Sequence, residues 1–292
     1  MKKTLFLLAA IAIACSFSAC EKEGVYHPKK KISKIYLQGD GAKQLYEKWT
    51  WEGKNLIKIS DATDQYYRKF TYEKDRIKKI LWNDASYISF SYDGKFIKRV
   101  DYYDEDGALE ETYNFTHTKS KITSVTVEYN DGKKSSRPDL ASTLRLFLPL
   151  PEQAVEQMTK RQERPASSAK GGFATTYEYV WDGDNIKTVT LSQVGNEYYY
   201  SEEYTFQYDK NRNPFYYCFD PEEAGPTFAT SKNNVILTEA VYSASYEGNS
   251  YSGTGTVEFD IVYDGKWPVE VLTMIREGGS TERYTTYYTY ED

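Results

Sequence analysis

An eleven-residue phrase recurs along this chain and constrains its fold more than any other feature of the sequence. Its clearest copy is FTYEKDRIKKI at residues 70–80, in which two aromatic residues spaced by two precede a polar turn and two aliphatic residues spaced by three. The same order returns in six other segments, the last two of which match more loosely: 49–59, 90–100, 179–189, 261–271, 113–125 and 206–217. A period of about twenty residues is typical of folds built from one repeated unit.

Each phrase predicts a β-hairpin. Phe70 and Tyr72 stand at positions i and i+2, which places both rings on the same side of a strand. Residues that tolerate the left-handed backbone of a tight turn follow the rings: Glu52-Gly53, Glu73-Lys74 and Asp93-Gly94. The spacing of three between Ile77 and Ile80 breaks strict alternation, so either the strand is bulged there or the first aliphatic residue caps the turn. We favour the bulge, because a bulge in every unit adds twist and curl to a sheet.

The predicted fold class is therefore all-β. Consecutive hairpins give an antiparallel meander of about 15–17 strands, in one large curled sheet or a partly open barrel. The aromatic content of 16%, with 29 Tyr, agrees with a strand-rich chain. Residues 32–292 form a single repeat-built domain that begins in the middle of a unit, with ISKI at residues 32–35.

The N-terminus has the three parts of an export signal. Lys2 and Lys3 form a charged start, residues 5–14 form an apolar stretch too short to span a bilayer, and Phe17-Ser18-Ala19-Cys20 ends in a cysteine. This arrangement resembles a bacterial lipoprotein signal. The resemblance implies that residues 1–19 are a signal peptide and that Cys20 carries palmitate-type acyl chains that anchor the protein to a membrane. An ordinary secretory signal, in which Cys20 is incidental, is the alternative.

Two segments interrupt or precede the repeat. Residues 20–31 are polar without periodicity and predict a short tether, in which His27 is solvated. The acidic and lysine residues after Cys20 resemble the surface-export signal of Bacteroidota lipoproteins, which implies an outer-membrane protein in the periplasm or on the surface. Residues 133–172 form an insertion that predicts a short helical part near 138–165, with Pro151 at a first helical position.

The repeat itself resembles the YD repeats of Rhs-type proteins and, more closely, a family of Bacteroidota lipoproteins with a domain of unknown function and a porin-like fold. The likeness covers residues 32–292 apart from the insertion. It implies a sheet that curls toward a barrel but does not imply a pore, because basic residues lie opposite the aromatic face, where a membrane barrel needs an apolar band: Lys58, Lys78, Lys98, Arg99 and Lys187.

Charge and cysteine content exclude several classes of function. A formal net charge of -6 lacks the basic excess that nucleic acid or an anionic membrane surface requires of its main partner. Cys218 is the single cysteine after Cys20, so the domain has no intrachain disulfide, and its strand-like surroundings favour a small buried hydrophobic residue over a nucleophile. No cofactor is indicated.

Few residues suggest a catalytic or metal site. His117, expected in a turn, is the single histidine of the repeat domain, and one imidazole without further partners makes neither a catalytic triad nor a metal cluster. Asp104 and Asp106 are weak calcium candidates, since their spacing lacks a full loop of oxygen ligands and fits a solvated hairpin turn.

Tyrosine doublets are the feature with most functional promise, because adjacent residues place one ring on each face of a sheet. We therefore take one tyrosine from each of four doublets as candidate ligand-binding residues: Tyr67, Tyr103, Tyr199 and Tyr217. Such rings can stack against sugars or peptides. The alternative is ordinary packing between cross-strand rings.

Two hypotheses of function follow. The first is a lipid-anchored, non-enzymatic envelope protein that binds a glycan, a peptide or a partner protein, and we favour it. The second is a hydrolase that acts on polysaccharide through two carboxylates facing each other at about 5–9.5 Å. The sequence singles out no such pair.

Overall fold

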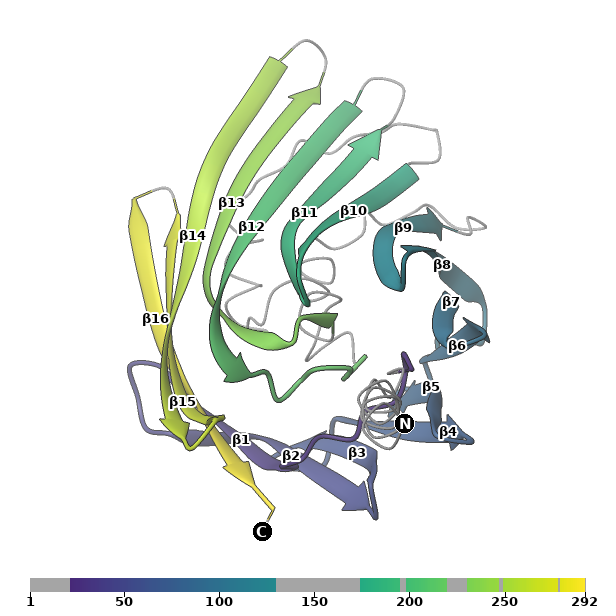
Figure 1. Ribbon diagram of the computed structural model, residues 1–292, viewed down its shortest axis with the longest axis vertical. Coiled ribbons are helices and arrows are strands. Elements are labelled where there is room, and N and C mark those ends of the chain that lie inside the picture. Colours follow the sequence, from purple (N-terminus) through teal and green to yellow (C-terminus); the bar gives the residue numbers. More distant parts are fainter. Residues whose placement is uncertain are drawn as a thin grey trace, which may run out of the picture.

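The computed structural model describes residues 22–129, 174–194, 198–219, 230–246, 249–277 and 279–291. Within these residues, sixteen antiparallel strands form one closed barrel, in which each strand pairs with its neighbours in sequence (Figure 1). The strands are β1 (Ile32–Gln38), β2 (Gln44–Glu52), β3 (Asn55–Asp61), β4 (Tyr67–Glu73), β5 (Arg76–Trp82), β6 (Tyr87–Asp93), β7 (Phe96–Tyr103), β8 (Leu109–Thr118), β9 (Lys121–Tyr129), β10 (Ala174–Asp182), β11 (Asn185–Val194), β12 (Tyr198–Arg212), β13 (Asn233–Tyr246), β14 (Asn249–Asp264), β15 (Trp267–Glu277) and β16 (Ser280–Tyr290). The predicted all-β meander is confirmed, whereas the predicted helix near 138–165 lies outside the described residues.

The expectation of a curled or partly open sheet is wrong, because β1 pairs with β16 and closes the barrel. The repeat region begins with the aliphatic half of a phrase at residues 32–35, and its last strand carries an aromatic half, in which Tyr288 and Tyr290 are spaced by two. Together the two terminal strands make one complete unit, with the usual register shift between Ile32 and Lys34. In Figure 1 the purple β1 accordingly lies beside the yellow β16.

The predicted bulge is present in six of the seven copies of the phrase, whereas the looser copy at 206–217 forms no hairpin, because β12 ends at Arg212 and residues 213–217 are not in a strand. Opposite Thr71 and Tyr72, for example, the register shifts so that Tyr72 pairs with Ile77 while Thr71 pairs with Lys79. The extra residue brings both aliphatic side chains to the inner face, and Ile77 and Ile80 are buried. The same shift occurs in five other hairpins: β2–β3, β6–β7, β8–β9, β10–β11 and β14–β15.

The predicted tight turns are also confirmed. Gly53, Gly94, Gly183 and Gly265 have φ between 55° and 62°, the left-handed region that glycine adopts without strain. Lys74 holds the same place with a φ of 58°. These turns all lie at one end of the barrel, which we call the turn end.

A repeated hydrogen bond joins neighbouring units, and the sequence did not reveal it. In six units the second ring donates its hydroxyl or indole N–H to the backbone carbonyl beside the bulge of the preceding unit, whereas Tyr263 in the copy at 261–271 donates to the side chain of Asp209. Six such bonds measure 2.6–2.7 Å: Trp51 to Ile32, Tyr72 to Leu56, Tyr92 to Ile77, Trp181 to Ile122, Tyr208 to Ile186 and Tyr290 to Pro268. Burial raises the pKa of Tyr92, Tyr208 and Tyr290, so these hydroxyls remain protonated donors.

The outer wall of the barrel is polar, and the inner face is mainly apolar with a few buried polar groups, such as the ion pair between Arg68 and Glu47. The rings and aliphatic residues of the phrase form one buried cluster that lines the interior. On the outside, β4 presents Tyr67, Lys69, Thr71 and Glu73. Among the described residues, the large apolar side chains that are exposed are scattered: Tyr66, Val180, Val194, Tyr199, Val241 and Val262.

The polar exterior differs from that of a membrane-spanning barrel, whose outer face carries an apolar band. Strands β1, β3, β4, β5 and β6 have seven residues each, fewer than the roughly 9–11 of a strand that crosses a bilayer, whereas β12, β13 and β14 have 15, 14 and 16. The wall around β1 and β3–β6 is therefore too short for a lipid-facing belt. Separately, none of the described segments is a helix long and apolar enough to span a membrane.

Candidate anion-binding pocket at the turn end

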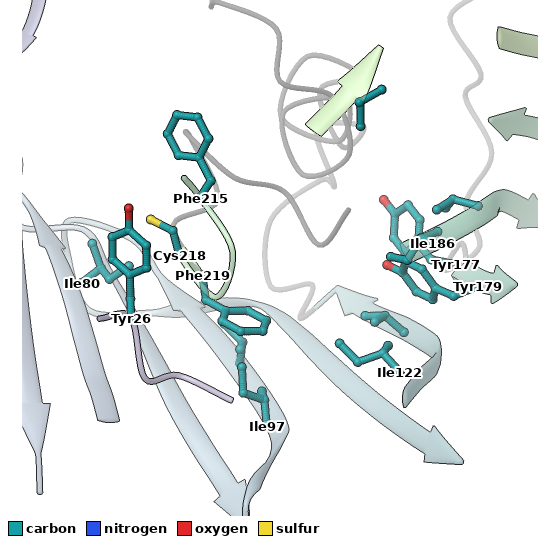
Figure 2. Close-up of a cluster of buried hydrophobic side chains, with 14 of the residues drawn as sticks. Tyr26, Ile80, Ile97, Ile122, Tyr177, Tyr179, Ile186, Phe215, Cys218 and Phe219 are labelled. Atoms are coloured by element: carbon teal, nitrogen blue, oxygen red, sulfur yellow. The ribbon is translucent and has the colours of Figure 1, made fainter. Parts of the chain in front are cut away.

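The residues before β1 pack against the barrel, although the sequence predicted a solvated tether over 20–31. Of the described part of that segment, Glu23, Gly24 and Tyr26 are buried. The Tyr26 ring packs against Trp49 and Trp51, and its hydroxyl donates a 2.8 Å hydrogen bond to the carbonyl of Pro214. Figure 2 shows Tyr26 with Phe215, Cys218 and Phe219 in the buried cluster.

We call residues 23–26 the N-terminal clasp. Its first residue, Glu23, donates its backbone N–H to the carbonyl of Lys95, and its carboxylate accepts a 2.6 Å bond from the N–H of Ile97. The same carboxylate lies 3.0 and 3.1 Å from Nε2 of His117. Gly24 accepts a 2.9 Å bond from the N–H of Ile77.

Gly24 is required by the space it occupies. Its φ is 77°, and a Cβ atom at this position would stand 2.1 Å from the hydroxyl of Tyr92, which is itself bonded to Ile77. Only a residue without a side chain fits between the clasp and that ring.

A pocket of about 200 Å³ opens between the N-terminal segment, the chain that follows β12, and the start of β15. Eleven residues line it: Lys22, Val25, His27, Pro28, Lys29, Arg212, Asn213, Pro214, Tyr216, Tyr217 and Trp267. This volume is below the roughly 300–1,000 Å³ of a site for a drug-sized ligand, so the pocket suits one small chemical group.

The charge of the pocket is uniformly positive. None of the described residues that line it is acidic, whereas Lys22, Lys29 and Arg212 are basic. Nearby lysines are neutralised, since Lys30 pairs with Asp264 and Lys31 with Glu291. Within the described residues, by contrast, the side chains of Lys22, Lys29 and Arg212 have no hydrogen-bond or ion-pair partner. Three cations without a salt-bridge partner attract an anion to this pocket, and Lys22 is in addition within electrostatic range of Asp75.

Aromatic rings complete the pocket wall. Tyr216 and Tyr217 lie with ring centroids 4.2 Å apart, and their hydroxyls are 3.3 Å from each other. Tyr217 has a φ of 68°, a left-handed conformation that is strained for a bulky residue and that concentrates at functional sites. The backbone before it is fixed by Asn213, whose side chain accepts from the N–H of Phe215 and donates to the carbonyl of Ser231.

Of the four candidate tyrosines, Tyr217 is the one that lines this pocket, and the structure does not bring the four together. Tyr67 lies on the outer wall, with the ammonium groups of Lys58 and Lys69 each 5.0 Å from its ring. Tyr103 stacks on Tyr87 at 4.5 Å, which is the cross-strand packing that the alternative predicted.

Tyr199 lies on β12 near the end opposite the turn end, paired in register with Val194 and 44% exposed. It therefore stands apart from the pocket.

The remaining candidates have structural roles. Asp104 accepts a 2.7 Å bond from the N–H of Ala108 and so caps a turn, and no group of metal-binding side chains occurs in the described ranges. His117 lies in β8, not in the predicted turn, and holds the clasp. Cys218 is buried, and His27, expected in solvent, lines the pocket within 3.3 Å of Asn55.

Sequence reasoning missed the clasp and the pocket cations. One signal was available, since His117 stands at the second ring position of its phrase, where other units carry Trp or Tyr. Another was Gly24 followed by Tyr26 in an otherwise polar stretch.

The fold is similar to that of two solved structures. One is a porin-like protein from Bacteroides vulgatus ATCC 8482, with a TM-score of 0.52 and 12% identity over 90% of this chain and 99% of that one. The other is a porin-like protein from Bacteroides uniformis ATCC 8492, with a TM-score of 0.51 and 12% identity over 92% of this chain and 100% of that one. At this identity the likeness establishes the barrel fold alone, which confirms the porin-like fold expected from the sequence. No family model and no curated protein matches the sequence.

Proposed function

We propose that this chain is a lipid-anchored protein of the bacterial outer membrane, periplasmic or surface-exposed, and that it acts as a non-enzymatic binding module. The N-terminal signal ending at Cys20 supports the anchor. The polar outer wall supports a barrel held beside the membrane, not within it.

The binding site that we propose is the pocket at the turn end, and its ligand is a small anionic group carried by an envelope molecule such as a glycan. The observation that carries this proposal is the set of three unpaired cations, Lys22, Lys29 and Arg212, in a pocket whose described lining has no carboxylate. Arg212 can meet a carboxylate or phosphate with two parallel N–H bonds. Tyr217 and Trp267 also line the pocket and can contact the apolar side of a sugar or other flat group.

The hydrolase alternative finds no support in this site. Hydrolysis of a glycoside needs two carboxylates that flank the scissile bond. The described lining of the pocket has neither Asp nor Glu, so it offers no acid and no base of that kind.

Calorimetric titration tests the proposal. Glucuronate and glucose 6-phosphate should bind saturably, whereas neutral glucose should not. Arg212→Ala should weaken binding about tenfold or more, which corresponds to the loss of about 1.4 kcal/mol expected for one charge-assisted contact. Lys78→Ala is the matched control, since Lys78 lies near the same end but pairs with Glu73. Equal affinity for the neutral and charged sugars, or an unchanged affinity in Arg212→Ala, would contradict the proposal.

A further inference from the structure

The bonds of the N-terminal clasp limit how far Cys20 can lie from the turn end. Cys20 precedes Lys22 by two residues. Two residues of fully extended chain span at most about 7 Å. From Glu23 onward the chain is bonded to the barrel, through the bond from Glu23 to the carbonyl of Lys95 and the bond from Ile77 to Gly24. An acyl group on Cys20 would therefore be held beside the turn end, because Cys20 lies only two residues before Lys22. The flexible tether expected over residues 20–31 would have allowed a much larger separation.

The pocket lies at this same end, and Lys22 belongs both to its lining and to the segment that leads to Cys20. Lys22 is the first described residue of the chain and also lines the pocket. Acyl chains on a cysteine place its backbone near the boundary between headgroups and hydrocarbon. A pocket whose rim begins two residues later lies at the level of the lipid headgroups.

The side chains that line the pocket have the composition of a membrane interface. Tyr and Trp concentrate at the headgroup layer, where one end of the ring is apolar and the other is wet, and Lys and Arg beside them attract lipid phosphates. The pocket combines Tyr216, Tyr217 and Trp267 with Lys22 and Arg212. Each basic residue close to an anionic membrane surface adds to the attraction locally, even though the net charge of the whole chain is -6.

We propose that the turn end docks on the membrane that holds the anchor, and that the pocket takes the phosphate of a lipid headgroup. This inference rests on the proposed function and names its ligand. The clasp between Glu23 and His117 acts as the positioning element, because it turns a flexible anchor into one that fixes which end of the barrel meets the lipid.

Orientation is tested with the acylated full chain in phosphatidylcholine vesicles that carry a headgroup-attached quencher. A fluorophore is placed on Lys54→Cys at the turn end or on Glu105→Cys in the opposite loop, both exposed positions. The protein without either change controls for labelling of the buried Cys218. The label at 54 should be quenched and the label at 105 should not. Equal quenching at both positions, or stronger quenching at 105, overturns the orientation.

The ligand is tested with Cys20→Ser protein, which lacks the anchor. It should float with phosphatidylcholine vesicles that contain phosphatidic acid and not with phosphatidylcholine alone, and Arg212→Ala should reduce flotation about tenfold. Flotation that persists undiminished in Arg212→Ala, or soluble glycerol 3-phosphate that binds as tightly as vesicle-borne phosphate, overturns the assignment to a lipid headgroup.

The two levels of the proposal fail separately. Absence of acyl-precursor labelling on the wild-type chain would remove the anchor of the proposed function. Normal labelling together with a quenched label at 105 would leave the anchor in place and reject the docked turn end.

Discussion

The β6–β7 and β8–β9 hairpins are neighbours with the same bulge and the same aliphatic pair, but they differ at one ring. In β6, Tyr92 donates its hydroxyl to the carbonyl of Ile77 in the preceding unit. In β8 the equivalent position is His117, which bonds to Glu23 of the clasp. This exchange replaces a bond between units by a bond to the N-terminal segment.

His117 is the position at which the β8–β9 hairpin departs from the repeat. A tyrosine at 117 would repeat the bond between neighbouring units and would leave the buried carboxylate of Glu23 without its imidazole. The same carboxylate also accepts the backbone N–H of Ile97, in the preceding unit. The departure from the repeat therefore coincides with the attachment point of the segment that leads to Cys20 and to the pocket.

The largest effect is expected from His117→Ala. This change leaves a buried carboxylate with one bond fewer, and it should lower the free energy of unfolding by about 3 kcal/mol. Urea denaturation measures the loss, and faster amide exchange at Ile97 reports release of the clasp. His117→Gln retains a donor and should recover part of the loss. A cost no larger than that of Tyr92→Phe would show that the two hairpins are equivalent after all.

A smaller effect is expected in a regular hairpin. Tyr72→Phe removes the 2.7 Å bond to the carbonyl of Leu56 and keeps the ring, so it should cost about 1 kcal/mol. Tyr67→Phe, on the outer wall of the same strand, is the matched control and should cost much less. If both changes give the same unfolding midpoint in urea, the bonds between units do not stabilise the barrel.

The smallest effect concerns the turns. Lys74 adopts the left-handed backbone that glycine adopts in the equivalent turn at Gly53. Lys74→Gly should therefore stabilise the protein by roughly 0.5 kcal/mol, whereas Gly53→Ala should destabilise it by about as much or slightly more. Differential scanning calorimetry of the two variants measures both signs. A loss of stability in Lys74→Gly would mean that strain at this turn is outweighed by the entropy of glycine in the unfolded chain.

Much of the wall could be predicted from the sequence. Pairs such as Phe70 and Tyr72, spaced by two, defined the inner face, and the spacing of three between Ile77 and Ile80 favoured a bulge over a turn cap, which the strand register confirms. Closure of the barrel was within reach, because the half-units at residues 32–35 and 286–290 complement each other. The pocket, by contrast, could not be predicted from the sequence. Of the four candidate tyrosines, only Tyr217 lies in the pocket. Adjacent tyrosines place one ring on each face of a sheet, but they do not show which other segments of the chain pack against that face.

The sequence by itself determined the hairpin unit, its turns, its bulge and its buried face, because each of these depends on residues within about a dozen positions of one another. Tertiary structure alone decided the clasp and the pocket. Glu23 meets His117 across 94 residues and Tyr26 meets Pro214 across 188, and no local period encodes such contacts. They form because a closed barrel leaves an apolar end to be covered, and the N-terminal segment and the chain after β12 are the parts that reach it.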